Sequence, residues 1–266
     1  MFAEATQDPN TGSLPVRLTS MAQRFVARRI CSKPLVLRDT SPMVSFTFDD
    51  VPASACEVGA PILERHGARG TFYIAGGGCG TGSPDGPMRA SMEQLRTVWK
   101  KGHEIGCHTY SHPTVRRMSN DGIGAEIDRN QVALKVIDAG IVIRNFAYPF
   151  GDLSVRTKRY LESRFDSCRS AHAGINSGVA DLGALDAWPL DSASLDRSKI
   201  ATLIDETARS RGWLIFHSHD VAERPSRYGV TPDLLEWAVG TARQAGCILA
   251  TVAGALSIIR NRAAND

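Results

Sequence analysis

The feature that most constrains the fold is a repeated alternation of short apolar segments with longer amphipathic ones, running from about residue 43 to 253. Residues 43–50 are followed by a helix-like stretch, and the same order returns along the chain until residues 247–252 close the series. About seven such units predict a parallel sheet, either doubly wound or closed into a barrel. In a barrel, chemistry collects where strands end and the following loops begin.

Length and composition are those of a globular protein that can bury one large core. The 266 residues are 42% hydrophobic and 22% charged, with a formal net charge of +3. The Lys and Arg residues form no stripe, so nucleic acid is not an expected partner. No linker divides the alternating region. We therefore expect an N-terminal extension over residues 1–40 and one catalytic domain over residues 41–260.

The chain shows no membrane or export signal that we recognise. No apolar run approaches the roughly 18 residues of a membrane helix, and the first 20 residues lack a basic start followed by an apolar stretch. The six cysteines are widely spaced without a CxxC pair, which favours buried, reduced thiols over a metal cluster. A cytoplasmic location is the resulting expectation.

Two adjacent carboxylates, Asp49 and Asp50, end the apolar segment "SFTF". Like charges side by side are costly unless something nearby neutralises one of them. A simple turn is one explanation, because Asp is common in turns. A bound cation is the other, since it would neutralise one carboxylate and leave the second free to accept a proton.

Histidines follow two other apolar segments. His108 and His112 are four residues apart after "HEIGC", a spacing that allows both imidazoles to reach one cation. His217 and His219 end "WLIFHSHD", where alternation turns them to the same face of a strand. Two histidines and one carboxylate leave coordination positions open for water, which is typical of catalytic zinc-like sites.

Four segments, in order, resemble the motifs of one known family. They are "TFDD" (47–50), "HTYSHP" (108–113), "FAYPFG" (146–151) and "IFHSHD" (215–220). Together they are similar to the polysaccharide deacetylases, the NodB-homology group or carbohydrate esterase family 4. The resemblance covers roughly residues 43–253. It implies an α/β fold, the distorted (β/α)7 barrel of NodB-like proteins, and metal-dependent removal of N-acetyl groups from a glycan.

The resemblance also implies roles for individual residues. Asp49 would be the general base and His219 the general acid, while the backbone N–H of Phe150 would help to hold the oxyanion. The metal, most simply zinc with cobalt or nickel as alternatives, would be bound by three residues: Asp50, His108 and His112. Expected substrate contacts are Tyr148, Pro149, Phe150, Trp188, His217 and Tyr228.

The chain departs from the family pattern at two catalytic positions. Many relatives have an arginine in the third motif that orients the base, but here that position is Ala147, and Arg144 is three residues earlier. His217 replaces a common leucine that lines the acetyl pocket, which makes the pocket more polar and makes His217 a rival for the acid role. The carboxylate that usually partners this acid is weakly matched by Asp186 or Asp191.

Two loops are candidates for substrate contact. Residues 76–86 resemble a phosphate-binding loop in composition only, because the Gly-Lys-Ser/Thr ending is missing, so we expect a flexible substrate loop. Residues 224–232 follow the histidine strand. Tyr228 could stack on a sugar ring and Arg224 or Arg227 could meet charge there, although an ordinary turn before the next helix is an equal alternative.

Three functional hypotheses follow. The first is a metal-dependent hydrolase that removes N-acetyl groups from an N-acetylated polysaccharide or oligosaccharide, with a bacterial surface glycan as the expected setting. The second keeps the fold and hydrolyses small cyclic amides or imides. The third is a catalytically silent glycan-binding protein.

Overall fold

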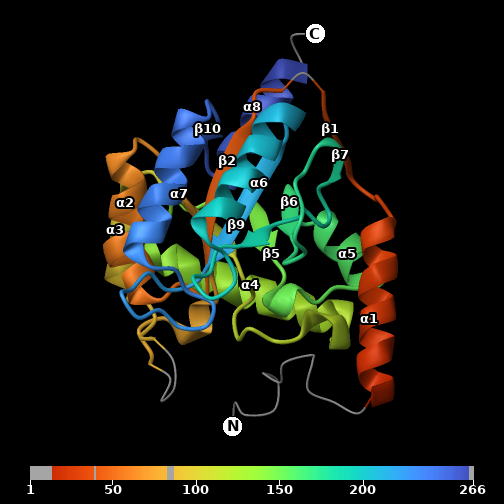
Figure 1. The fold of residues 1–266 in the computed structure, drawn as a ribbon. Coiled ribbons are helices and arrows are strands. Elements are labelled where there is room, and N and C mark those ends of the chain that lie inside the picture. The colour runs from red at the N-terminus through yellow and green to blue at the C-terminus, as the bar shows by residue number, and fades with distance from the viewer. Residues whose placement is uncertain (1–13, 39, 83–86, 264–266) are drawn as a thin grey trace.

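The computed structural model describes residues 14–38, 40–82 and 87–263, and its centre is a parallel sheet of eight strands (Figure 1). The strand order is β6-β5-β4-β3-β2-β9-β8, with β10 also paired to β2. The strands are β2 (Met43–Asp49), β3 (Thr71–Ile74), β4 (Glu104–Cys107), β5 (Asn145–Ala147), β6 (Ser167–Arg169), β8 (Trp188–Pro189), β9 (Trp213–Ser218) and β10 (Ile248–Leu249).

Helices connect and cover these strands. They are α1 (Leu14–Arg29), α2 (Ala60–Arg65), α3 (Met92–Lys100), α4 (Asn120–Ile137), α5 (Val155–Glu162), α6 (Arg197–Ser210), α7 (Pro232–Gln244) and α8 (Val252–Ala263). Helix α3 begins at a capping box, in which Ser91 and Gln94 cap each other reciprocally. Gly102 and Gly246 take positive φ just after α3 and α7, as helix-ending glycines do.

The sheet curls into an incomplete barrel. Its two edges, β6 and β8, come close through a bridge between Arg169 and Leu185, which lies just before β8. Every strand pair in this sheet is parallel. The carboxyl ends of the strands therefore meet at one rim, where the polar segments of the sequence follow them.

Strand β2 is the centre of the fold. All seven of its residues are buried, and it pairs with β9 along one side and with β3 and β10 along the other. Its aromatic residues pack on neighbouring strands: Phe46 stacks on Phe216, and Phe48 lies against Phe72. Aromatic and β-branched residues favour strands for this reason, and they carry Asp49 to the rim.

The segment before β2 packs on the barrel. Helix α1 lies along one side of the molecule beside α5 (Figure 1), and β1 (Pro34–Leu37) pairs antiparallel with β7 (Gly178–Asp181). Lys158 of α5 is buried; its Nζ donates to the carbonyl of Ala27 at 3.0 Å and also contacts the carbonyl of Ile30 and the carboxylate of Asp181. The expected boundary at residue 40 stays a prediction, and residues 1–13 lie outside the described chain.

Two further expectations concern the surface and the thiols. Among the residues described, no helix has the length and apolar character needed to cross a membrane. All six cysteines are free thiols, and four of them are buried. Burial raises the pKa of Cys107 to about 11, so this thiol is protonated at neutral pH, as expected for a packing residue.

Candidate active site

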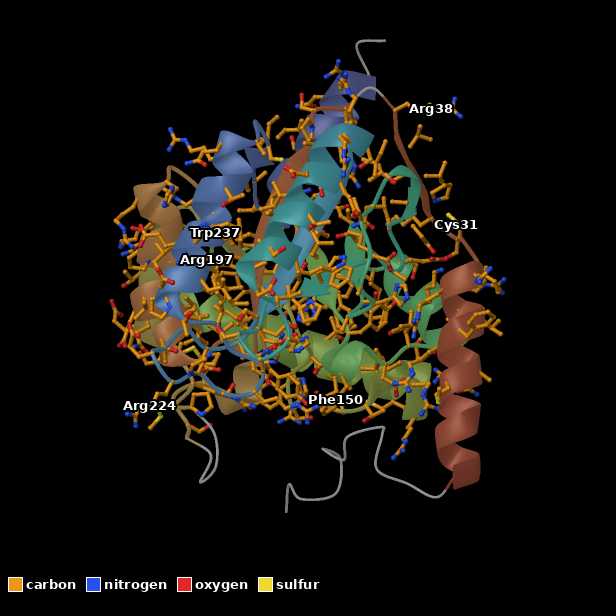
Figure 2. The ribbon with its side chains drawn as sticks, in the orientation of Figure 1. Cys31, Arg38, Phe150, Arg197, Arg224 and Trp237 are labelled. Atoms are coloured by element: carbon orange, nitrogen blue, oxygen red, sulfur yellow. The ribbon has the colours of Figure 1, made fainter. Side chains whose placement is uncertain are left out.

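A cavity of about 800 Å³ opens at the carboxyl ends of the strands. Residues from five strand ends line it, so the parallel sheet brings together side chains that are far apart in sequence. The lining includes Asp49, Asp50, His108, His112, Tyr148, Phe150, Arg169, His217, His219 and Tyr228. Figure 2 shows Phe150 at this end of the molecule.

Asp50, His108 and His112 form a group that could hold a metal ion. One ligand atom from each lies within 4.8 Å of the other two. Nε2 of His112 is 3.7 Å from Oδ1 of Asp50, and the two imidazole centroids are 4.8 Å apart. The structure thus brings together the three side chains that the sequence predicts as ligands.

The donor atoms of this group fit a divalent cation. Oδ1 of Asp50 is buried, and no described residue gives it a hydrogen bond. Nδ1 of His108 is 2.9 Å from the carbonyl oxygen of Ala147, to which it donates, and this leaves Nε2 with its lone pair. Burial lowers the pKa of His112 to about 4, so its imidazole is neutral and able to bind a metal at pH 7. An ion here would satisfy a buried oxygen that otherwise has no partner.

The backbone is strained around the same group. Asp50, His112 and Phe150 have φ values of 55°, 57° and 58°, a left-handed region that residues other than glycine seldom adopt. Such strain persists only where the surrounding structure enforces it, and it clusters at functional sites. The edge-to-face contact of Phe150 with His112, at 4.5 Å between ring centroids, joins two of these positions.

Asp49 is held by an arginine that the sequence reasoning missed. Nη2 of Arg169, at the end of β6, donates to both carboxylate oxygens of Asp49, the contact with Oδ2 being 2.5 Å. Burial is the largest single effect and by itself would raise the pKa of Asp49, but the Arg169 charge and the neighbouring imidazoles together outweigh burial and hold this pKa well below its usual range. Asp49 is therefore ionised at neutral pH, as a base must be.

Arg169 occupies the place of the missing motif arginine from the neighbouring strand. Arg169 is opposite Ala147 in the register of β5 and β6. The arginine of this chain is therefore on the adjacent strand, at the same level as the motif position. Arg144, the earlier candidate, is 61% exposed and forms an ion pair with Asp166 instead. The signal in the sequence was an arginine in the short segment "FDSCRSA" (165–171), but the partner of Arg169 could not be predicted without the strand order.

The two histidines of β9 and its following loop both line the cavity. Nδ1 of His217 is 4.0 Å from Oδ2 of Asp49, and burial together with the Arg169 charge lowers its pKa to about 3. His219 packs against Tyr228 in a tilted arrangement, with 5.4 Å between ring centroids. Its Nδ1 has no hydrogen-bond partner within the described chain.

Neither suggested tuning carboxylate reaches His219. Asp186 is 3.0 Å from Nδ1 of His172, and Asp191 accepts hydrogen bonds from the backbone N–H groups of Ala193 and Ser194. Neither candidate therefore partners His219 in the structure, because Asp186 is paired with His172 from the segment after β6 and Asp191 binds the backbone of its own loop.

The predicted substrate contacts divide into two groups. Phe150 is 36% exposed and Tyr228 is 54% exposed, and both line the cavity with His217. Tyr148 also lines it, but its hydroxyl donates to the carbonyl of Gly183 in the interior.

The other two predicted contacts, Pro149 and Trp188, do not line the cavity. Pro149 is buried. Trp188 packs against the main hydrophobic core, and Nζ of Lys199 lies 5.1 Å from its ring centroid. Trp188, expected from the sequence to contact substrate, is thus a packing residue in the structure.

Both candidate loops reach the cavity rim. Thr81 and Gly82 come from the glycine-rich loop, of which residues 83–86 lie outside the described chain. Ser226, Arg227 and Tyr228 come from the loop after β9. Arg224 is exposed at the outer edge of the molecule (Figure 2) and does not line the cavity.

Comparison with known proteins relates part of this chain to polysaccharide deacetylases. The polysaccharide deacetylase family model matches residues 37–164. The bifunctional xylanase/deacetylase of Pseudobutyrivibrio xylanivorans is 27% identical over 51% of this chain and 22% of its own length. The peptidoglycan-N-acetylglucosamine deacetylase of Listeria monocytogenes is 24% identical over 47% of this chain and 26% of its own. The chain thus spans about a quarter of the length of these curated relatives.

Solved structures share the fold over most of the chain. The chitin deacetylase of Colletotrichum lindemuthianum has a TM-score of 0.58 at 19% identity, covering 82% of this chain and 88% of that one. A carbohydrate esterase family 4 pseudoenzyme from Bacillus anthracis has a TM-score of 0.52 at 16% identity, covering 80% and 64%. The expected distorted (β/α)7, NodB-like fold is confirmed.

Proposed function

Residues 37–164 of this chain match the polysaccharide deacetylase family model, and on that premise we propose that the chain is a metal-dependent hydrolase that removes N-acetyl groups from a polysaccharide or oligosaccharide. The observation that carries the proposal is the pairing of Asp49 with Arg169 beside the group Asp50, His108 and His112. One carboxylate is kept ionised as a base, and the other lies with two neutral imidazoles.

The ligand set suits zinc, with cobalt or nickel as alternatives. A bound divalent cation would supply a Lewis acid that polarises the amide carbonyl and acidifies a water molecule. Proton transfer, oxyanion binding and substrate positioning are carried out by residues of the chain.

Asp49, fixed by Arg169, takes a proton from the attacking water. The backbone N–H of Phe150 is available to the oxyanion. His219 donates a proton to the amine as the carbon–nitrogen bond breaks. Tyr228, which packs against His219, holds a sugar ring at the rim, so that the scissile amide reaches Asp49.

The decisive experiment measures acetate release from N-acetylglucosamine oligomers by the zinc-loaded protein, before and after a chelator. Release should stop with the chelator and return with zinc. Asp49→Asn should lower kcat by at least about a hundredfold while zinc binding is kept, whereas Asp50→Asn should lose the zinc. Glycan binding that is unchanged by Asp49→Asn, without any acetate release from the wild type, would instead show a silent binding protein like the pseudoenzyme relative.

A further inference from the structure

His217 is the feature of the cavity that the proposed function leaves without a role. Its side chain is 12% exposed, it lines the cavity, and its Nδ1 lies 4.0 Å from Oδ2 of Asp49. Both ring nitrogens are buried, and neither forms a hydrogen bond with any described residue. Polar atoms buried in this way normally have partners, so two on one ring need an explanation.

The His217 ring can both donate a hydrogen bond to a bound substrate group and accept one from it. With its pKa lowered to about 3, His217 is neutral at pH 7. A neutral imidazole has one nitrogen that donates and one that accepts. A bound group that is only apolar would leave both unsatisfied, and that is costly in a buried site. A hydroxyl group both donates and accepts, so it can pair with either tautomer.

The position of His217 indicates which part of the substrate it meets. The acyl carbon must lie within reach of the water that Asp49 deprotonates. The substituent on that carbon is therefore also close to Asp49, and His217 is the imidazole beside Asp49. His217 consequently faces the acyl group and not the sugar ring.

We propose, on the basis of the proposed function, that His217 selects acyl groups that carry a hydroxyl, so that N-glycolyl amides are substrates and are favoured over N-propionyl amides of equal size. Water oxygen bonds to the acyl carbon, the carbon–nitrogen bond breaks, and the amine leaves with a proton. The products are the free amine and glycolate.

The test compares three amides of one glucosamine oligomer, bearing N-acetyl, N-glycolyl or N-propionyl groups, with the zinc-loaded full chain. Glycolyl and propionyl differ only in a terminal hydroxyl or methyl, so they form a matched pair. The wild type should show kcat/KM at least about tenfold higher for glycolyl than for propionyl. His217→Leu should abolish this preference, His217→Gln should keep part of it, and Trp188→Phe, outside the cavity, should leave it unchanged.

A second measurement does not depend on turnover. Glycolate should bind the zinc-loaded wild type more tightly than propionate does, and His217→Leu should remove the difference while binding zinc with unchanged stoichiometry. A preference that survives His217→Leu, or a wild type that favours propionyl, overturns the inference. Release of acetate without any glycolyl preference rejects this inference alone, whereas no release from any of the three amides rejects the proposed function and the inference together.

Discussion

At the residue scale, the contact between Arg169 and Asp49 combines two opposing effects. Both side chains are nearly buried, with 1% and 7% exposed, and burial disfavours the charge on each. The guanidinium supplies the compensating charge and holds the carboxylate in one orientation. A lysine would be a poorer substitute, because its ammonium lacks the planar array of donors.

We predict that Arg169→Gln lowers kcat about 10- to 100-fold, since Asp49 loses the group that orients it. The pKa of Asp49 should then rise, because the guanidinium charge no longer opposes the effect of burial. The acidic limb of the pH profile of kcat/KM should accordingly move to higher pH. An acidic limb that stays in place in a folded, zinc-binding variant would contradict the assignment of Asp49 as the base.

The same pair should contribute to stability in a pH-dependent way. The folded pKa of Asp49 lies below its unfolded value of about 3.9, so the pair stabilises the protein above that pH and the stabilisation is lost as pH falls below it. At pH 7, Arg169→Gln should reduce the free energy of unfolding by about 3–5 kcal/mol, because it leaves a buried charge unpaired. Arg144→Gln is the matched control: this arginine is exposed, and its loss should change stability by less than about 1 kcal/mol.

The ligand group could be predicted from sequence, whereas the partner of the base could not. His108 and His112 are local to one loop, and Asp49 and Asp50 are adjacent, so spacing pairs the histidines with each other and the carboxylates with each other. Both pairs directly follow strands of one parallel sheet, so the two pairs are expected at the same rim. Arg169 meets Asp49 only because β6 and β2 belong to one curled sheet. The contact depends on tertiary closure, about which a short motif says nothing.

At the scale of elements, the alternating pattern located most strands and helices, because apolar strands and amphipathic helices have different periods. It missed β1, β7 and the two-residue strand β8, which lie outside the regular strand–helix alternation. It also gave no account of how α1 joins the body. That attachment depends on the buried side chain of Lys158, and charged residues are seldom fully buried.

We predict that Lys158→Met loosens α1. The substitution removes the amine that contacts the last carbonyls of α1 and leaves Asp181 without its buried partner. Amide hydrogen exchange should become faster across residues 21–30 and remain slow in β2. Because none of these α1 residues lines the cavity, kcat should change less than about twofold if the fold persists.

The control is Lys101→Met, since Lys101 is 47% exposed in its ion pair with Glu64. Its loss should leave exchange in α1 unchanged and alter stability by less than about 1 kcal/mol. Equal exchange in α1 for both variants would show that Lys158 does not hold the helix.

At the scale of the whole molecule, metal binding should stabilise the fold. The ligands come from the loops after β2 and β4, and they are assembled only in the folded chain. Free zinc at about 100 times its Kd should add about 2.7 kcal/mol to the free energy of unfolding. For a domain of this size, that corresponds to a rise in Tm of about 5–10 °C.

Thermal unfolding with zinc and with a chelator measures this effect. Asp50→Ala should lose the rise in Tm, while Asp49→Asn should retain most of it. An equal rise in wild type and Asp50→Ala would place the ion at another site.

The position of β2 has a consequence for folding during synthesis. On the ribosome, Asp49 and Asp50 emerge well before two of the strands that pair with β2, because β9 begins at Trp213 and β10 at Ile248. A nascent chain that stops before residue 213 lacks the neighbour that flanks β2 along most of its length. The candidate site is thus completed only after residue 219 has been synthesised, and a product that ends earlier carries the first motif without the strand that holds it in place.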